Sequence, residues 1–203
     1  MKRIFTALFI LFAGPLFAQT YINPKIGISF MNLSDPPPGY DYKGDVGFQM
    51  GADFRFGNAF QLIPGLYYNQ VATAVKVTGV DTLDIEDNII RNTLKARVLI
   101  GYNFINEDKF KLRVKAGPAF DYLLNSKTAD NKIDFDEENF KDGTWSLEAG
   151  AGLDLWFLTL DVGYSYGLSN AYKDDVIEVD SKYLGLYVKA GVVIKLSDGQ
   201  SGN

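Results

Sequence analysis

Carboxylates at alternate positions in one polar stretch are the clearest candidates for ligand chemistry. Asp134, Asp136 and Glu138 supply oxygen ligands, which Ca²⁺ and Mg²⁺ prefer. A calcium loop of the helix–loop–helix type would carry glycine next, whereas Asn139 stands there. The pattern predicts a weak cation-binding loop at most, and a solvated acidic loop is the simpler interpretation.

The residue types that most catalysis requires are missing from the chain. The 203 residues include no histidine and no cysteine, which excludes Ser-His-Asp catalysis, disulfides and metal sites built on Cys or His. With 25 acidic and 20 basic residues, the net charge of −5 gives no electrostatic reason to bind nucleic acid. We expect neither an enzyme nor a cofactor.

Strands must position the charged residues, because polar and apolar residues alternate along the chain. Between Val46 and Phe56 every second residue is apolar, and a strand separates such residues onto opposite faces. The same period recurs over residues 22–31, 60–70, 93–104, 110–121, 145–155, 158–168 and 183–196. These eight segments have about ten residues or more, the length of a tilted strand that crosses a bilayer.

The connections between the segments alternate in length. Residues 57–58, 105–109 and 156–157 form short connections, whereas residues 32–44, 71–92, 124–143 and 169–182 form long ones. Short turns on one side and long loops on the other are typical of outer-membrane barrels. We predict an all-β fold: an eight-stranded antiparallel up-and-down transmembrane β-barrel with four long extracellular loops.

Glycine indicates which face of the barrel lies inside. Twelve glycines lie on the polar face and none on the apolar face: Gly27, Gly47, Gly51, Gly65, Gly101, Gly117, Gly150, Gly152, Gly163, Gly167, Gly185 and Gly191. Glycine is useful where space is short, as at the axis of a narrow barrel. We therefore predict the apolar face outward against lipid. A soluble lipocalin-like carrier, with its apolar face inside, is the alternative.

The polar face then carries charged side chains into the barrel, where buried charges need partners. The candidate cations are Lys25, Arg55, Lys95, Arg97, Lys111, Arg113, Lys115, Lys189 and Lys195, and the candidate anions are Asp45, Asp53, Asp121, Glu148, Asp154 and Asp161. We predict a structural polar network centred on Lys25, Asp53, Arg55, Lys95, Arg97, Arg113, Asp121, Glu148, Asp154, Asp161 and Lys189. Eight strands enclose little free space, which favours a packed polar core over a narrow ion path.

Residues 1–18 have the pattern of an export signal. Lys2 and Arg3 precede an apolar run, and Ala18 suits the position before a cleavage site. The run is shorter than the roughly 20 residues that span a bilayer, so a retained anchor is the weaker interpretation. We predict cleavage near Ala18 and a barrel domain over residues 19–203 in the cell outer membrane.

Several glycine-containing motifs resemble the PorT-like outer-membrane β-barrel family of Gram-negative bacteria. They are QLIPGLYY (61–68), KAGPAFDY (115–122), GAGLD (150–154) and DVGYSYGLS (161–169). The resemblance covers nearly the whole mature chain and implies a membrane barrel, while the namesake of the family assists protein secretion. KAGVVIKL (189–196) is similar to the terminal signal for the outer-membrane insertion machinery, with Leu196 in place of the usual aromatic residue.

Two hypotheses about function follow for a membrane barrel. The first is a non-enzymatic barrel that acts structurally or presents its loops. The second is a small transport or secretion-accessory barrel that contacts a periplasmic complex. The expected partners are outer-membrane lipid and lipopolysaccharide, the insertion machinery during assembly, and an unknown extracellular or periplasmic protein. A lipid-modifying enzyme is disfavoured because the chain has no histidine.

Overall fold

One closed antiparallel sheet makes up the fold in the computed structural model, which describes residues 19–34, 40–44, 46–77, 85–128, 142–170 and 182–197. The strands are β1 (Thr20–Leu33), β2 (Tyr40–Gly44), β3 (Val46–Phe56), β4 (Phe60–Val77), β5 (Ile85–Asn106), β6 (Phe110–Thr128), β7 (Gly143–Leu155), β8 (Leu158–Gly167), β9 (Tyr183–Val192) and β10 (Ile194–Ser197). Within these residues, no helix is long and apolar enough to cross a membrane.

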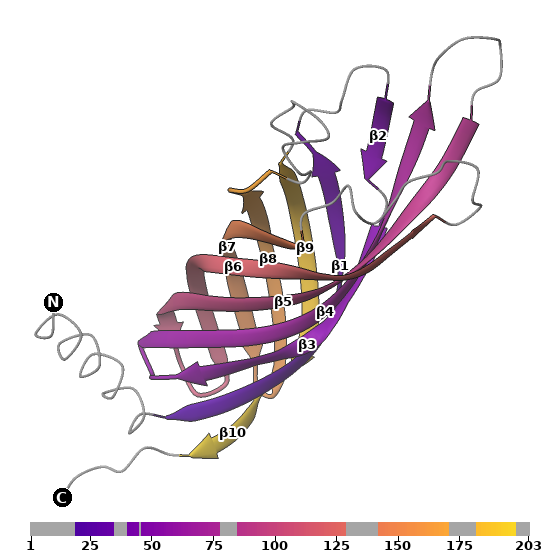
Figure 1. The fold of residues 1–203 in the computed structure, drawn as a ribbon. Helices are drawn as coiled ribbons and strands as arrows, with labels where there is room; N and C mark the ends of the chain where they lie inside the picture. The colour runs from indigo at the N-terminus through magenta and orange to yellow at the C-terminus, as the bar shows by residue number, and fades with distance from the viewer. Residues whose placement is uncertain are drawn as a thin grey trace, which may run out of the picture.

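The sheet closes because β1 pairs with both β3 and β9 (Figure 1). The other long strands pair in chain order from β3 to β9. The short β2 pairs only with β4, and β10 follows β9 after Val193 and pairs with the start of β1. The barrel therefore has eight strands, and the predicted eight-stranded antiparallel barrel is confirmed.

Three tight turns lie at one end of the barrel, here called the turn end. They connect β3 to β4, β5 to β6, and β7 to β8, and they occupy residues 57–59, 107–109 and 156–157. Gly57 has a φ of 112° and Trp156 a φ of 58°. Glycine adopts this conformation at little cost, but tryptophan does not. The opposite end is called the loop end.

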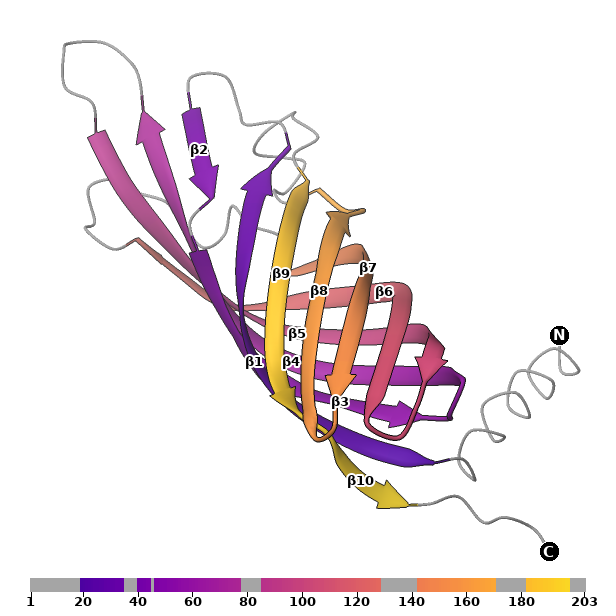
Figure 2. The same ribbon diagram turned by 180° about the vertical axis from the view of Figure 1, so that it is seen from behind.

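Strands β4 and β5 continue past the other strands at the loop end, as both views of the ribbon show (Figures 1 and 2). All 18 residues of β4 pair with β5, from Phe60 with Tyr102 to Val77 with Ile85. The prediction of a loop over residues 71–92 is therefore wrong outside residues 78–84. Val71, Val75 and Val77 favour a strand. However, the alternation of polar and apolar residues is weaker where the β4–β5 hairpin extends beyond the barrel wall.

Apolar side chains point outward and charged side chains point inward. Ile100 is 67% exposed, whereas Arg97 is 2% exposed and Asp161 is 0% exposed. Along β8 exposed and buried residues alternate without interruption. The predicted orientation is confirmed, and the alternative of a soluble carrier with an apolar lining is wrong.

Aromatic rings lie near both ends of the outward face. Phe120 and Trp145 are 5.0 Å apart near the loop end, and Phe60 and Tyr102 are 4.8 Å apart near the turn end. Phe110 and Phe120 lie at the two ends of this band on β6. Ten residues at about 3.3 Å each, tilted by about 40°, give a height of roughly 25 Å, which is the usual apolar height of a membrane barrel.

Inward glycines leave space for the largest interior side chains. A Cβ atom on Gly152 would lie 2.5 Å from Arg113 Nε, and one on Gly191 would lie 2.7 Å from Lys25 Cγ. A Cβ atom on Gly51 would lie 2.7 Å from the ring of Tyr67. Gly191 and Gly51 are also crowded by the backbone carbonyl oxygens of Pro24 and Leu66, so only glycine fits there, whereas a larger residue at Gly152 would displace the Arg113 side chain.

Several apolar residues interrupt the polar interior, and Ile63 and Leu99 are the largest aliphatic ones that are fully buried in the described part of the chain. Ile63 and Leu99 face each other across β4 and β5, and both are fully buried. Gly101 lies beside them, because a Cβ atom there would be 2.8 Å from Ile63 Cδ1. The alternation of β4 marks Ile63 as an exception, and the structure explains it as part of a small apolar layer inside the barrel.

Candidate functional site

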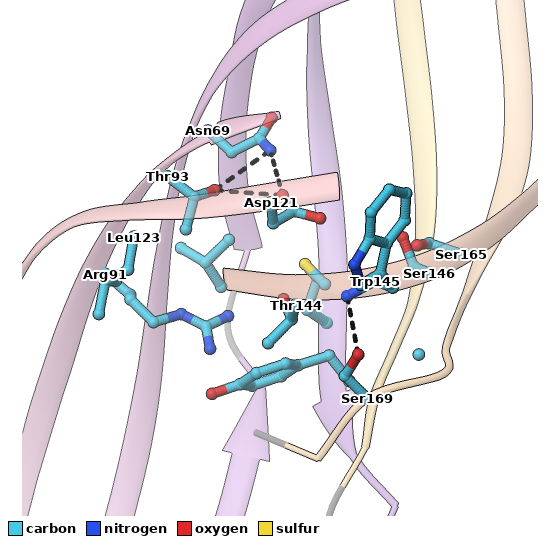
Figure 3. A pocket seen from close by; sticks show the side chains of 14 residues that line it. Asn69, Arg91, Thr93, Asp121, Leu123, Thr144, Trp145, Ser146, Ser165 and Ser169 are labelled. Atoms are coloured by element: carbon cyan, nitrogen blue, oxygen red, sulfur yellow. Dashed lines mark hydrogen bonds between the residues drawn. The ribbon is translucent and has the colours of Figure 1, made fainter. Parts of the chain in front are cut away.

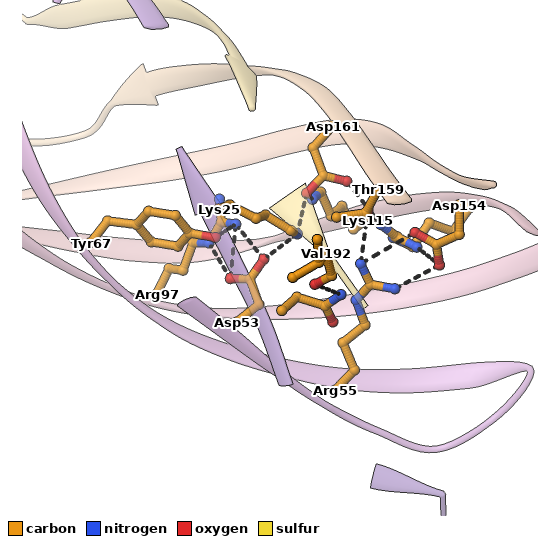
Figure 4. Close-up of polar contacts among 12 residues, drawn as sticks. Lys25, Asp53, Arg55, Tyr67, Arg97, Lys115, Asp154, Thr159, Asp161 and Val192 are labelled. Atoms are coloured by element: carbon orange, nitrogen blue, oxygen red, sulfur yellow. Dashed lines mark hydrogen bonds and ion pairs between the residues drawn. The ribbon is translucent and has the colours of Figure 1, made fainter. Parts of the chain in front are cut away.

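Ion pairs begin near the turn end with two arginines on one carboxylate (Figure 4). Asp154 accepts hydrogen bonds from Arg55 Nη1 at 2.7 Å and from Arg113 Nη1 at 2.6 Å. Thr159 Oγ1 accepts from the Nη2 atoms of both arginines, at 3.1 and 2.9 Å. Arg113 Nη2 also donates to Asp161 Oδ1 at 2.9 Å, which carries the network toward the barrel centre.

Three cations surround Asp161 at the centre of the network. Besides Arg113, Lys115 Nζ lies 2.6 Å from Asp161 Oδ2, and Lys25 Nζ contacts the same oxygen. Lys25 Nζ also donates to Asp53 Oδ2 at 2.7 Å. The side chains of Lys25, Asp53 and Asp161 have no exposed surface, so these charges depend on one another for stabilisation.

Further ion pairs continue from Asp53 toward the loop end. Arg97 Nη2 donates to both oxygens of Asp53 at 2.9 Å, and Arg97 Nη1 donates to Glu148 Oε2 at 2.8 Å. Lys95 Nζ then lies 2.8 Å from Glu148 Oε1 and 3.3 Å from Asp121 Oδ2. The ion pairs thus run without a break from Arg55 to Asp121.

We call this network the charge ladder. Its members are Arg55, Asp154, Arg113, Asp161, Lys115, Lys25, Asp53, Arg97, Glu148, Lys95 and Asp121. Period-two spacing places charges two residues apart on one inward face, as with Asp53 and Arg55 on β3. β5 and β6 supply Lys95, Arg97, Arg113 and Lys115, and β7 and β8 supply Glu148, Asp154 and Asp161.

The ladder crosses the barrel axis. Arg55 lies on β3 and Asp154 on β7, and four steps around the barrel separate these strands in either direction. Their contact of 2.7 Å therefore joins opposite walls. Arg97 on β5 reaches past β6 to Glu148 on β7, which is two strands away. Side chains that bridge opposite walls fill the space through which a solute would pass.

Lys189 lies beside the ladder without joining its ion pairs. Its Nζ has no hydrogen-bond partner in the described part of the chain, but lies 4.0 Å from the ring centre of Tyr67 and 4.2 Å from that of Tyr187. These contacts stabilise a cation through the aromatic ring faces. The ladder contains six cations and five carboxylates, so Lys189 brings the excess to two positive charges.

A small cavity lies at the loop end, next to Asp121 of the ladder (Figure 3). Its volume is about 30 Å³, which is room for water rather than for a larger ligand. Asn69 Nδ2 donates to Asp121 Oδ1 at 3.2 Å, and the guanidinium of Arg91 lies 3.7 Å from the ring centre of Tyr183. Arg91 was missing from the predicted interior because the sequence placed it in a loop.

A larger cavity of about 260 Å³ lies at the turn end. Lys111 and Lys195, which the sequence places inside the barrel, line this cavity. Lys195 is exposed and Lys111 is half-buried, so both lie at the mouth of the barrel, and neither belongs to the ladder.

Metal binding has no support in the described part of the chain. No group of three or more Asp or Glu residues is placed there to hold a metal ion. The predicted cation-binding loop with Asp134, Asp136 and Glu138 lies outside the described residues, as does Asp45. That loop therefore stays a prediction.

Comparisons with known proteins agree with the fold. The family model "Outer membrane protein beta-barrel domain" matches residues 17–173. The chain is similar to the outer membrane protein OprG from Pseudomonas aeruginosa, with 16% identity, a TM-score of 0.55, and coverage of 88% of this chain and 96% of OprG. It is also similar to Ail, the attachment invasion locus protein of Yersinia pestis, with 17% identity, a TM-score of 0.45, and coverage of 87% and 99%. No curated protein matches the sequence.

Proposed function

The chain belongs to the outer membrane protein beta-barrel domain family, and from this premise we propose that it is a non-enzymatic, plugged barrel that acts structurally or through its loops. The charge ladder is the observation that carries this proposal. A barrel with an ion-conducting role needs a continuous path, whereas here the buried Arg55–Asp154 ion pair joins opposite walls and Arg97–Glu148 spans a neighbouring part of the lumen. The absence of histidine and cysteine from the chain supports a non-enzymatic role.

The proposal also covers the partners of the barrel. Outer-membrane lipid and lipopolysaccharide would contact the outward apolar face, and the insertion machinery would recognise the last strand, β9 with β10, during assembly. Within the family, the motifs of β4, β6, β7 and β8 support a PorT-like branch. An extracellular or periplasmic protein would bind at the loops or the turns.

Ion conductance tests the proposal directly. Because the ladder fills the lumen, the mature barrel inserted in planar lipid bilayers is expected to give no steady single-channel steps. A wide general porin in the same bilayers is the control for insertion and recording. Reproducible steps from the purified wild-type barrel would show that the lumen conducts and would refute the plug.

An arginine substitution on the outward face tests whether that face contacts lipid. Val162 lies in the middle of β8 and is 49% exposed, so Val162→Arg places a charge in the bilayer interior. This substitution is expected to lower the free energy of unfolding by about 2–4 kcal/mol, whereas Leu168→Arg, just beyond the loop end of β8, is expected to cost about 0–1 kcal/mol. Urea titration in phospholipid vesicles measures both, and equal costs would contradict the assigned membrane position.

A further inference from the structure

The larger of the two cavities described above lies at the turn end of the barrel. It encloses about 260 Å³. Arg55 and Gln61 form its buried inner wall, and Lys111 lies at half-buried depth. Lys109 and Trp156 are exposed at its rim. This space is large enough for a small molecule with several heavy atoms, unlike the loop-end cavity of about 30 Å³.

The charge of this cavity is positive. Arg55, Lys109, Lys111 and Lys195 line it, against only Asp108 and Asp154. The single negative charge of Asp154 is shared between Arg55 and Arg113, at 2.7 and 2.6 Å, so it does not compensate the lysines. A chain with a net charge of −5 thus concentrates positive charge at one mouth.

The surroundings strengthen this positive potential. Arg55 is held in place because it donates to Asp154 at 2.7 Å and to Thr159 at 3.1 Å, so the floor of the cavity is rigid. Low-dielectric walls focus the field of charges that line a cleft. Such a field favours small anions over cations, and it weakens as salt screens the exposed lysines.

Trp156 fixes one side of the opening. Its φ of 58° is a left-handed conformation that glycine or asparagine adopts more readily. Its backbone N–H donates to the carbonyl of Lys109 at 2.8 Å, and its ring contacts Phe157 edge-on at 5.0 Å. The two-residue turn between β7 and β8 favours a positive φ at its first position, and this turn holds the exposed Trp156 at the cavity rim.

We propose that the turn-end cavity binds small soluble anions that carry a phosphate or carboxylate group. Lys109, Lys111 and Lys195 supply the charge, and Arg55 forms the floor. The wall consists of inward side chains and turn residues, so the cavity opens toward the barrel axis and the periplasm rather than toward lipid. A soluble anion therefore fits this site better than a lipid headgroup. This inference is independent of the proposed plug.

Calorimetric titration of the refolded mature chain in an uncharged detergent tests the site. Inorganic phosphate and acetate are the probes, and we expect saturable binding at low salt that weakens as salt is added. Replacing Lys109, Lys111 and Lys195 together by Gln is expected to weaken binding about tenfold or more. Lys182→Gln, which removes a cation at the loop end, is the control and should bind as wild type does. No saturation, or equal binding by the triple variant, would overturn the proposal.

The two tryptophans of the chain locate the bound anion. Trp145→Phe leaves Trp156 as the only indole, and Trp156→Phe leaves only Trp145. Iodide is expected to quench Trp156 more strongly than caesium does, phosphate should reduce the iodide effect, and Trp145 should show neither response. Equal quenching of Trp156 by the two ions would refute the positive site. A response of Trp156 to phosphatidylglycerol vesicles but not to phosphate would show a lipid headgroup instead, and would also overturn the proposal.

Discussion

Asp161→Asn is expected to lower the free energy of unfolding by about 3–5 kcal/mol. Asp161 is completely buried and contacts Lys25, Arg113 and Lys115. A neutral amide leaves these three cations close together without their shared counter-charge, and the low-dielectric interior strengthens their repulsion. Urea unfolding in phospholipid vesicles, followed by electrophoretic mobility before and after heating, measures the loss.

Lys115→Met is the informative contrast to Asp161→Asn. Lys115 pairs with Asp161. After the substitution Asp161 still has two cationic partners, Lys25 and Arg113. Because cations are in excess inside the barrel, we expect a change of less than about 1 kcal/mol, or a gain in stability. Asp108→Asn, at an exposed turn, is the surface control. If Asp161→Asn costs no more than this control, the ladder does not stabilise the fold.

Gly163→Ala is expected to lower the free energy of unfolding by about 1–3 kcal/mol. A Cβ atom at this position would lie 2.5 Å from Tyr187 Cζ and 2.8 Å from the carbonyl oxygen of Ala149. Tyr187 cannot simply turn away, because its ring also contacts the ammonium of Lys189. Thermal and urea unfolding of the refolded barrel measure the effect.

A second substitution tests the cause of this effect. Tyr187→Leu removes the ring that the new methyl group meets, so the cost of Gly163→Ala should be smaller in that background, although Ala149 still limits the space. Ala190→Val adds carbon atoms on the outward face of β9 and should be tolerated. If Gly163→Ala lowers the free energy of unfolding equally in the wild-type and the Tyr187→Leu backgrounds, then contact with the Tyr187 ring is not the cause of the loss.

The alternation of polar and apolar residues predicts most of the fold, because this pattern depends only on residues that are neighbours in the sequence. It predicted the bounds of β3 and the outward position of residues such as Ile100. It did not predict the paired extension of β4 and β5 beyond the barrel wall, where residues 71–77 have no continuous polar face. Nor did it predict that Leu99 lies opposite Ile63 inside the barrel.

The membership of the interior could be read from residue types, but its pairing could not. Arg55 and Asp154 are 99 residues apart in the chain, and their contact depends on barrel closure and strand register. No local pattern indicates that three cations share Asp161. The left-handed conformation of Trp156 was also unpredictable, because tryptophan rarely adopts it.

The bridge between opposite walls constrains how the barrel enters its membrane. Arg55 on β3 meets Asp154 on β7 only when the sheet has curled completely. Until that moment a hairpin such as β5–β6 carries Arg97, Arg113 and Lys115 without their carboxylate partners, which lie on other strands, and hydrocarbon strongly disfavours such charges. We therefore expect that the hairpins do not insert into the membrane one after another. Instead, the strands stay in contact with water or with another protein until the barrel closes in one concerted step.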